Sequence, residues 1–252
     1  SGNKVELTSE ALSLLKPETI SEEPIAGEPP YMGLRYFDTQ DADLFYGREV
    51  LTRELLARVQ KESFLAIVGA SGSGKSSVAR AGLIPAWAKE NERGAVHVIT
   101  PTAHPLESLA ASLTHESESV TATSTLMDDL KNDSRSLRLY VKKTLGETKS
   151  LLLVDQFEEL FRFKDSTDPN SVNETLAFVN LLMEAINYTD NPIYVAITMR
   201  SDFIGDCSQF PELTRKINDS HYLIPQMTRE QKRRAIEGPV AVGGAQITPR
   251  LV

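Results

Sequence analysis

The sequence predicts an α/β protein built on a parallel five-stranded sheet with helices on both faces. Short apolar runs alternate along the chain with segments of helical spacing, and a glycine-rich turn directly follows the first run. The runs are continuous rather than alternating, which is typical of parallel strands buried on both faces. We expect strands at 64–68, 95–100, 151–154, 193–198 and 221–225.

The segments between these runs predict the covering helices. Apolar residues recur there every three or four positions, as on one face of a helix. We expect helices at 48–61, 75–89, 105–114, 125–146, 172–187, 203–218 and 228–237. Residues 115–135 are polar and rich in Ser, Thr and Asp, so we expect a solvated connection that leads into a helix.

The first thirty residues differ in composition from the rest. Residues 4–15 predict a short helix, whereas residues 16–30 hold four prolines and four glutamates and have the composition of a linker. We therefore expect an N-terminal helix and linker over 1–30, a folded domain over 31–227, and the beginning of a further helical element over 228–252.

Composition and charge exclude several classes of function. The net charge of -8 disfavours generic binding to nucleic acid or anionic lipid, because both need a basic surface. Cys207 is the single cysteine, so no intrachain disulfide can form. No apolar run approaches the roughly 20 residues of a membrane span, and the N-terminus lacks a signal-peptide pattern. We expect a cytoplasmic protein.

The turn after the first strand, GASGSGKSS (69–77), predicts a phosphate-binding loop. It matches G-x-x-x-x-G-K-[ST] and lies between a predicted strand and a predicted helix. Glycines let successive N–H groups approach one anion, and the helix adds the positive end of its dipole. Lys75 would reach the β- and γ-phosphates of a nucleotide, and the Ser76 hydroxyl would ligate Mg²⁺. The candidate nucleotide contacts are Gly69, Ala70, Ser71, Gly72, Ser73, Gly74, Lys75, Ser76 and Ser77.

An acidic cluster follows the apolar run of the third predicted strand, in LLLVDQFEEL (151–160). A buried carboxylate at a strand end needs a cationic or hydrogen-bonding partner. Asp155 is therefore the candidate second ligand of Mg²⁺, as in other P-loop proteins. Glu158 or Glu159 would activate the attacking water, and the sequence does not decide between them. The plainer alternative is that both glutamates begin a solvated helix, where acids favour the N-terminus.

Arg200 ends the fourth predicted strand, IYVAITMR. Ligands bind at the carboxyl ends of parallel strands, so a cation placed there could sense a γ-phosphate. The alternative is a surface arginine paired with the nearby Asp202.

Taken together, these motifs resemble the STAND branch of the AAA+-related P-loop NTPases, which is NLR-like, and within it the bacterial novel STAND NTPase 1 domain. The similarity extends over about residues 30–240. Besides the P-loop it is carried by PYMGLRYF (30–37), DADLFYGRE (41–49), TPTAHPLESLAASL (100–113), LLLVDQFEELF (151–161), ITMRSDF (197–203) and MTREQKRRAIEGP (227–239).

The resemblance implies a sheet order of 5-1-4-3-2, with Tyr46, Gly47 and Arg48 near the adenine and ribose of ATP or ADP. Arg200 would match the sensor arginine of the family. Family members are signalling switches in which ADP holds a closed monomer, and ATP permits homo-oligomerisation that activates an attached effector. A C-terminal repeat array is the usual sensor, and many bacterial members act in antiviral defence.

The resemblance also implies a helical lid and a winged-helix domain after the core. Here residues 228–252 match only the beginning of the lid, so we expect loose nucleotide binding and slow Mg²⁺-dependent ATP hydrolysis.

Other functions stay open from the sequence alone. A housekeeping P-loop ATPase or small-molecule kinase would share the motif, and so would an interaction scaffold with a structural nucleotide. A DNA-dependent ATPase is disfavoured by the charge, because the basic cluster at 229–234 fits one solvated helix face. GTP is disfavoured because the chain contains no N-K-x-D base-reading motif.

Overall fold

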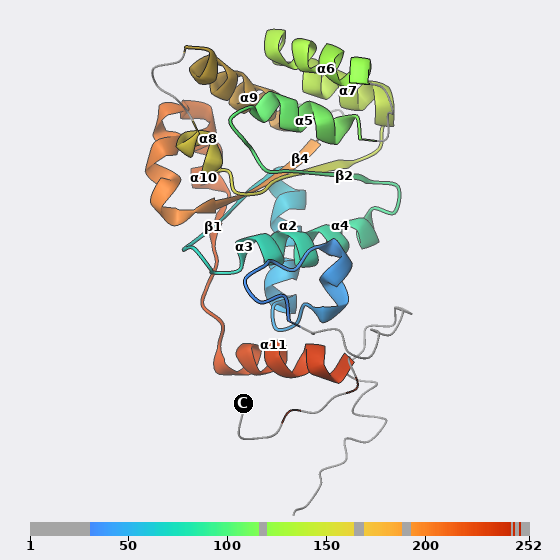
Figure 1. Cartoon of the computed structure of the whole chain (residues 1–252), viewed down its shortest axis with the longest axis vertical. Coiled ribbons are helices and arrows are strands. Elements are labelled where there is room, and N and C mark those ends of the chain that lie inside the picture. Colours follow the sequence, from blue (N-terminus) through green and yellow to red (C-terminus); the bar gives the residue numbers. More distant parts are fainter. Residues whose placement is uncertain are drawn as a thin grey trace, which may run out of the picture.

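The computed structural model of the chain describes residues 31–115, 120–163, 169–187, 193–242, 244 and 247. Its centre is one parallel sheet of five strands in the order β2-β3-β4-β1-β5 (Figure 1). The predicted order 5-1-4-3-2 is therefore confirmed. The strands are β1 (Phe64–Gly69), β2 (Ala95–Ile99), β3 (Ser150–Val154), β4 (Ile193–Arg200) and β5 (His221–Leu223).

The three central strands are buried on both faces, which explains their continuous apolar sequences. In β1, Leu65 and Ile67 enter one hydrophobic core, whereas Phe64, Ala66 and Val68 enter the core on the opposite face. Side chains alternate along a strand, so a strand covered on both sides needs apolar residues at every position. The outer strand β5 has only three residues and is partly exposed.

Helices cover the two faces of the sheet as separate layers (Figure 1). One layer contains α2 (Glu49–Glu62) and a long helix composed of α3 (Lys75–Ser77), the π-helical segment η2 (Val78–Leu83) and α4 (Ile84–Glu90). The other layer contains α5 (Pro105–Leu113), α6 (Val120–Asn132), α7 (Ser136–Leu145), α9 (Pro169–Asn187) and α10 (Pro211–Asp219). Shorter pieces are η1 (Thr39–Leu44), α8 (Glu159–Arg162) and η3 (Ser201–Gln209).

Two helix predictions are wrong between strands β2 and β3. The single helix expected over 125–146 is two helices, α6 and α7, and most of the expected polar connection at 115–135 belongs to α6. Leu126 and Leu130 of α6 are buried in the core, so α6 is an amphipathic helix whose polar residues form its solvent-facing side. The break follows from Asp133, whose carboxylate accepts the Arg135 N–H at 2.9 Å and so competes with helical hydrogen bonding.

Two further predictions need correction. The helix expected over 203–218 is the 3₁₀ segment η3 followed by α10, which restarts at Pro211, a residue favoured at the first helical position. The helix expected over 75–89 is present, but its middle is π-helical. The predicted helix over 4–15 and the predicted linker lie outside the described residues.

The last described helix, α11 (Arg229–Val242), lies apart from the sheet and next to the segment that precedes α2 (Figure 1). The Tyr31 hydroxyl donates to the Ile236 carbonyl at 2.7 Å, and Arg234 pairs with Glu49 at 3.0 Å. Residues 31–49 therefore lie between α11 and the body of the domain.

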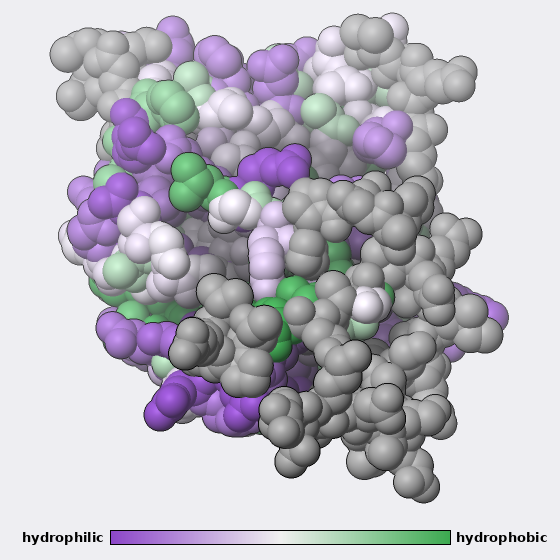
Figure 2. Space-filling model, turned by 60° about the horizontal axis from the view of Figure 1, so that its bottom comes forward, coloured by the Kyte–Doolittle hydropathy of each residue, from purple (hydrophilic) through white to green (hydrophobic). Residues whose placement is uncertain are grey.

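The surface that carries α11 is mainly polar. In Figure 2, apolar residues of the described chain form separate spots among polar ones. Within the described residues, no helix is both long and apolar enough to cross a membrane.

Candidate functional site

The predicted phosphate loop connects β1 to the long helix that begins at Lys75. Gly72 and Gly74 have φ angles of 73° and 86°, in the left-handed region that favours glycine. A side chain at Gly69 would place its Cβ only 2.7 Å from Ser73 Oγ. The backbone conformation of the loop therefore favours glycine at positions 72 and 74, and the loop leads into the helix N-terminus, where anions bind.

Lys75 lies inside this loop. Its Nζ donates to the Gly69 and Ala70 carbonyls at 3.1 and 2.8 Å, and its side chain is buried. Burial lowers the pKa of Lys75 below its ordinary value of 10.5, although the charge of Glu158 acts in the opposite direction. The ammonium group is held at the loop in a site where a nearby anion would stabilise its charged form.

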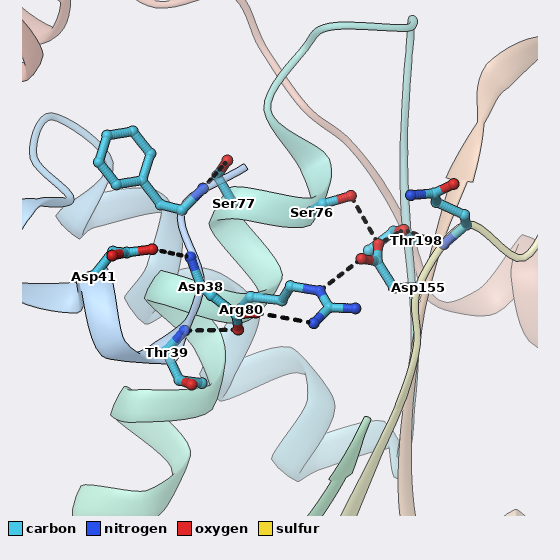
Figure 3. Close-up of polar contacts among 10 residues, drawn as sticks. Asp38, Thr39, Asp41, Ser76, Ser77, Arg80, Asp155 and Thr198 are labelled. Atoms are coloured by element: carbon cyan, nitrogen blue, oxygen red, sulfur yellow. Dashed lines mark hydrogen bonds and ion pairs between the residues drawn. The ribbon is translucent and has the colours of Figure 1, made fainter. Parts of the chain in front are cut away.

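Asp155 follows β3 and is completely buried. Its Oδ1 accepts hydrogen bonds from the Ser76 hydroxyl at 2.8 Å and the Thr198 hydroxyl at 2.6 Å. Its Oδ2 accepts from Arg80 Nε at 2.7 Å (Figure 3). The carboxylate at the end of the buried strand therefore has a cationic partner from the protein itself.

The turn after Asp155 is fixed by the neighbouring strand β4. Gln156 has a φ of 58°, a left-handed conformation that costs a non-glycine residue about 1 to 2 kcal/mol. Its N–H donates to Thr198 Oγ1 at 2.9 Å, and the Phe157 N–H donates to the Thr198 carbonyl at 2.8 Å. Thr198 thus holds both the carboxylate of Asp155 and the strained turn.

The two glutamates of the acidic cluster point to different partners. Glu158 Oε2 accepts the backbone N–H of Arg200 at 3.3 Å, and its charge acts on Lys75. Glu159 Oε1 pairs instead with Arg162 at 2.6 Å, one turn along α8. Both are buried. The structure therefore brings Glu158 toward the phosphate loop and turns Glu159 toward its own helix.

Arg200 lies beside the phosphate loop, since β4 pairs it with Gly69 in the parallel register. Its guanidinium forms a two-pronged ion pair with Asp202, with Nε 3.1 Å from Oδ1. Arg200 therefore lies at the expected edge of the sheet. It also pairs with Asp202, as the alternative of a surface arginine predicts. Its role as a γ-phosphate sensor stays a prediction.

Tyr46, Gly47 and Arg48 lie at the start of α2, against α11. A Cβ at Gly47 would lie 2.4 Å from the Gln231 carbonyl oxygen, and Gly47 has a φ of 84°. Arg48 is buried, with 6% of its surface exposed, and no acceptor among the described residues lies within hydrogen-bonding distance of its Nη1. A buried guanidinium nitrogen without an acceptor is rare in folded proteins and is compatible with a ligand contact.

The oxygen donors around Asp155 fit a magnesium ion. Mg²⁺ prefers oxygen ligands, and proteins hold it by one or two side chains together with water and phosphate oxygens. The Asp155 carboxylate and the Ser76 hydroxyl supply this set, with no cluster of three or more acidic, His or Cys side chains among the described residues.

Two residues of the site were not found from the sequence, Thr198 and Arg80. A signal for each was present. Thr198 lies two positions before Arg200, so both point to the same face of β4, and Arg80 lies four positions after Ser76, one helical turn along.

Solved structures support the fold. The structure of the Aeropyrum pernix ORC2 protein in ADPNP–ADP complexes superposes with a TM-score of 0.51 and 17% identity, over 77% of this chain and 51% of that one. The Walker-type ATPase PABY2304 of Pyrococcus abyssi gives a TM-score of 0.51 and 17% identity, over 85% and 63%. This chain thus spans less than two thirds of either protein. No significant match was found among curated proteins.

The family model described as Novel STAND NTPase 1 matches residues 30–252, which is most of the chain. The matched region includes the phosphate loop, the acidic cluster after β3 and helix α11. This chain therefore belongs to the novel STAND NTPase 1 family of P-loop NTPases.

Proposed function

We propose that this chain is the ATP-binding and ATP-hydrolysing switch domain of a STAND signalling protein. The observation that carries the proposal is the contact between Ser76 and Asp155, at 2.8 Å, directly beside the buried ammonium of Lys75. It supports a site in which Ser76 and Asp155 would bind a metal ion and Lys75 would bind phosphate at the mouth of one glycine-rich loop.

In this proposal Lys75 leaves the Gly69 and Ala70 carbonyls and meets the β- and γ-phosphates. Ser76 and Asp155 would hold Mg²⁺, which would supply charge neutralisation at the phosphates. Glu158 orients the attacking water and accepts its proton, because it is the glutamate that faces the loop. Arg200 leaves Asp202 for the γ-phosphate and so distinguishes ATP from ADP.

The base and ribose would lie near the Tyr46–Arg48 segment, beside the buried side chain of Arg48. The buried Nη1 of Arg48, which has no acceptor among the described residues, supports a ligand there. Adenine is the proposed base, and the ORC2 structure that resembles this fold is described as ADPNP–ADP complexes. We assign residues 31–227 to the nucleotide-binding domain and residues 228–252 to the beginning of the lid.

We propose the switch from the resemblance to the family, and the contact between α11 and the Tyr46 segment is compatible with it. ADP would hold α11 closed against the Tyr46 segment, and exchange for ATP would release it and permit homo-oligomerisation. The attached effector would then be activated, as in antiviral defence by related bacterial systems. A cytoplasmic location follows from this role.

The test is to purify the chain, release its contents with acid and identify any nucleotide. We expect less than one ADP per chain, in keeping with the loose binding expected from the sequence, and we expect Lys75→Ala to purify without it. Lys89→Ala, which changes an exposed lysine of α4, is the control and should retain ADP. An unchanged ADP content in Lys75→Ala would contradict the proposed role of the loop, and ATP loss that depends on an added acceptor, without phosphate release, would favour a kinase.

A further inference from the structure

We propose that Arg80 is a built-in counter-ion that competes with the metal ion for Asp155 and couples the metal site to residues 36–38. The inference rests on the proposed function, because it concerns the same metal–nucleotide site. It adds a residue that neither the P-loop motif nor the acidic cluster includes.

Arg80 is shared between two carboxylates and an aromatic ring. Its Nε lies 2.7 Å from Asp155 Oδ2, and its Nη1 lies 3.4 Å from Asp38 Oδ2. Its guanidinium carbon lies 4.6 Å from the centre of the Tyr36 ring. The Arg80 side chain is 12% exposed and Asp155 is fully buried, whereas the Asp38 side chain is 37% exposed. Figure 3 shows Arg80 between the two carboxylates. A single cation thus links the end of β3 to the segment that precedes η1.

The helix geometry places Arg80 for this role. Ser76 and Arg80 are one turn apart on the P-loop helix, and both donate to the Asp155 carboxylate. Arg80 also lies within the π-helical segment η2, in which the Ile84 N–H donates to the Ala79 carbonyl. Such segments are rare and occur often at functional sites. The local change of helical register is therefore located at the residue that reaches Asp155.

The segment on the other side of Arg80 is docked by two more kinds of contact. The Phe37 N–H donates to Ser77 Oγ on the P-loop helix at 3.2 Å. Asp38 Oδ1 accepts the Thr39 N–H at 2.8 Å, which caps η1, while Oδ2 of the same carboxylate faces Arg80. Movement of Arg80 would therefore change the contacts of Asp38, which caps the start of η1.

A metal ion at Ser76 and Asp155 would bring a second positive charge next to this guanidinium. Like charges repel strongly where water is excluded, and Asp155 is fully buried. Metal binding must therefore weaken the contact between Arg80 and Asp155, and Asp38 is the carboxylate that can take a larger share of the cation. Coupling between two sites is reciprocal, so changes at Asp38 must alter metal affinity in turn.

Two variants should then act in opposite directions. Arg80→Gln removes the competing cation and should strengthen Mg²⁺ binding. Asp38→Asn removes the second acceptor for Arg80 and should weaken Mg²⁺ binding, while asparagine retains a good helix cap. If the network had a purely structural role, both variants would bind Mg²⁺ more weakly.

The measurement is the ratio of ADP dissociation constants in EDTA and in saturating Mg²⁺, determined on the whole chain. We expect Arg80→Gln to raise this ratio about tenfold and Asp38→Asn to lower it severalfold, in the usual range of coupling between sites. Arg135→Gln, which breaks an exposed Arg135–Asp133 pair between α6 and α7, is the matched control and should leave the ratio unchanged.

A second readout tests the coupling directly. Hydrogen exchange at residues 36–45 should decrease when Mg²⁺ is added to the ADP-bound wild-type chain, because Arg80 then pairs more closely with Asp38, and should not respond to Mg²⁺ in Arg80→Gln. Equal or same-direction shifts of the ratio in the two variants would overturn the inference. If Arg80→Gln does not fold, an unchanged or raised ratio in Asp38→Asn is sufficient to overturn it. A wild-type chain that binds no ADP under either condition contradicts the proposed function instead.

Discussion

Ser76 and Asp155 are 79 positions apart in the sequence, and the hydroxyl of the first donates to the carboxylate of the second at 2.8 Å. The contact joins the first turn of the P-loop helix to the end of β3. It exists because β1 and β3 are both parallel to β4, which lies between them, so their carboxyl ends meet at the same edge.

We expect the chain to take up protons when it binds ADP at alkaline pH. Burial lowers the pKa of Lys75 below 10.5 in the free chain, and phosphates beside Nζ would raise it again. The affinity for ADP should therefore be highest at pH values below the lowered pKa of Lys75, and it should fall as the pH rises through that pKa. Calorimetry in two buffers of different ionisation enthalpy measures the protons exchanged. Lys89→Met should retain the uptake, whereas proton release by the wild-type chain would contradict the assignment.

Thr198→Val should destabilise the fold as well as the site. The substitution keeps the side-chain shape but removes the hydroxyl that donates to Asp155 and accepts from Gln156. Leaving these buried groups unpaired should lower the free energy of unfolding by about 2 kcal/mol, as measured in urea.

The control for this variant is Thr125→Val. Thr125 is exposed, and its hydroxyl bonds only within helix α6, to the Thr121 carbonyl. Its effect should stay within about 0.5 kcal/mol. Equal losses in the two variants would mean that the hydroxyl of Thr198 has no special role.

Substitutions of the two glutamates should differ in their effect on the rate of ATP hydrolysis. Glu158→Gln should reduce ATP hydrolysis by about 10²- to 10⁴-fold, because Glu158 is the one that faces the loop. ADP affinity should be nearly unchanged, since the glutamate acts on water. Glu159→Gln is the matched variant, and it breaks the pair with Arg162. Phosphate release under saturating ATP decides, and a larger loss in Glu159→Gln would reverse the assignment.

The sequence predicted the sheet better than the helices. A strand such as β3 is buried along its whole length, so its apolar run marks its position without knowledge of its neighbours. The helix α6 could not be recognised as easily, because its polar face dominates the composition and only tertiary contacts of Leu126 and Leu130 show which face is buried. The break at Asp133 also depends on one local side-chain bond.

The proximity of the predicted site residues could be expected from the sequence only in part. Lys75 and Ser76 are neighbours in one motif, and Asp155 lies near them because parallel strands end at the same edge of the sheet. The partner of Asp155 could not be predicted, because the sequence does not show whether a basic side chain or a metal ion meets the buried carboxylate. The structure adds Arg80 as the cation. Its role depends on a contact between β3 and η2 that only the folded chain creates.

The contact between α11 and Tyr46 gives the sharpest test of the proposed lid. A Cβ at Gly238 would lie 2.4 Å from Tyr46 Cγ and 2.6 Å from Cδ2, closer than real contacts allow. Gly238→Ala should therefore displace α11 from the Tyr46 segment and weaken ADP binding, with a loss of stability of about 1 to 3 kcal/mol from overpacking.

Gly205→Ala on η3 is the control, since no atom lies within 4 Å of its added methyl group. A double-mutant cycle identifies the cause. Tyr46→Ala removes the ring, so the additional Gly238→Ala substitution should then cost little stability, and the two effects should not add. Additive losses in the cycle would show that Gly238→Ala acts elsewhere than on the Tyr46 ring, and would remove the Tyr46 contact as the element that holds the proposed lid.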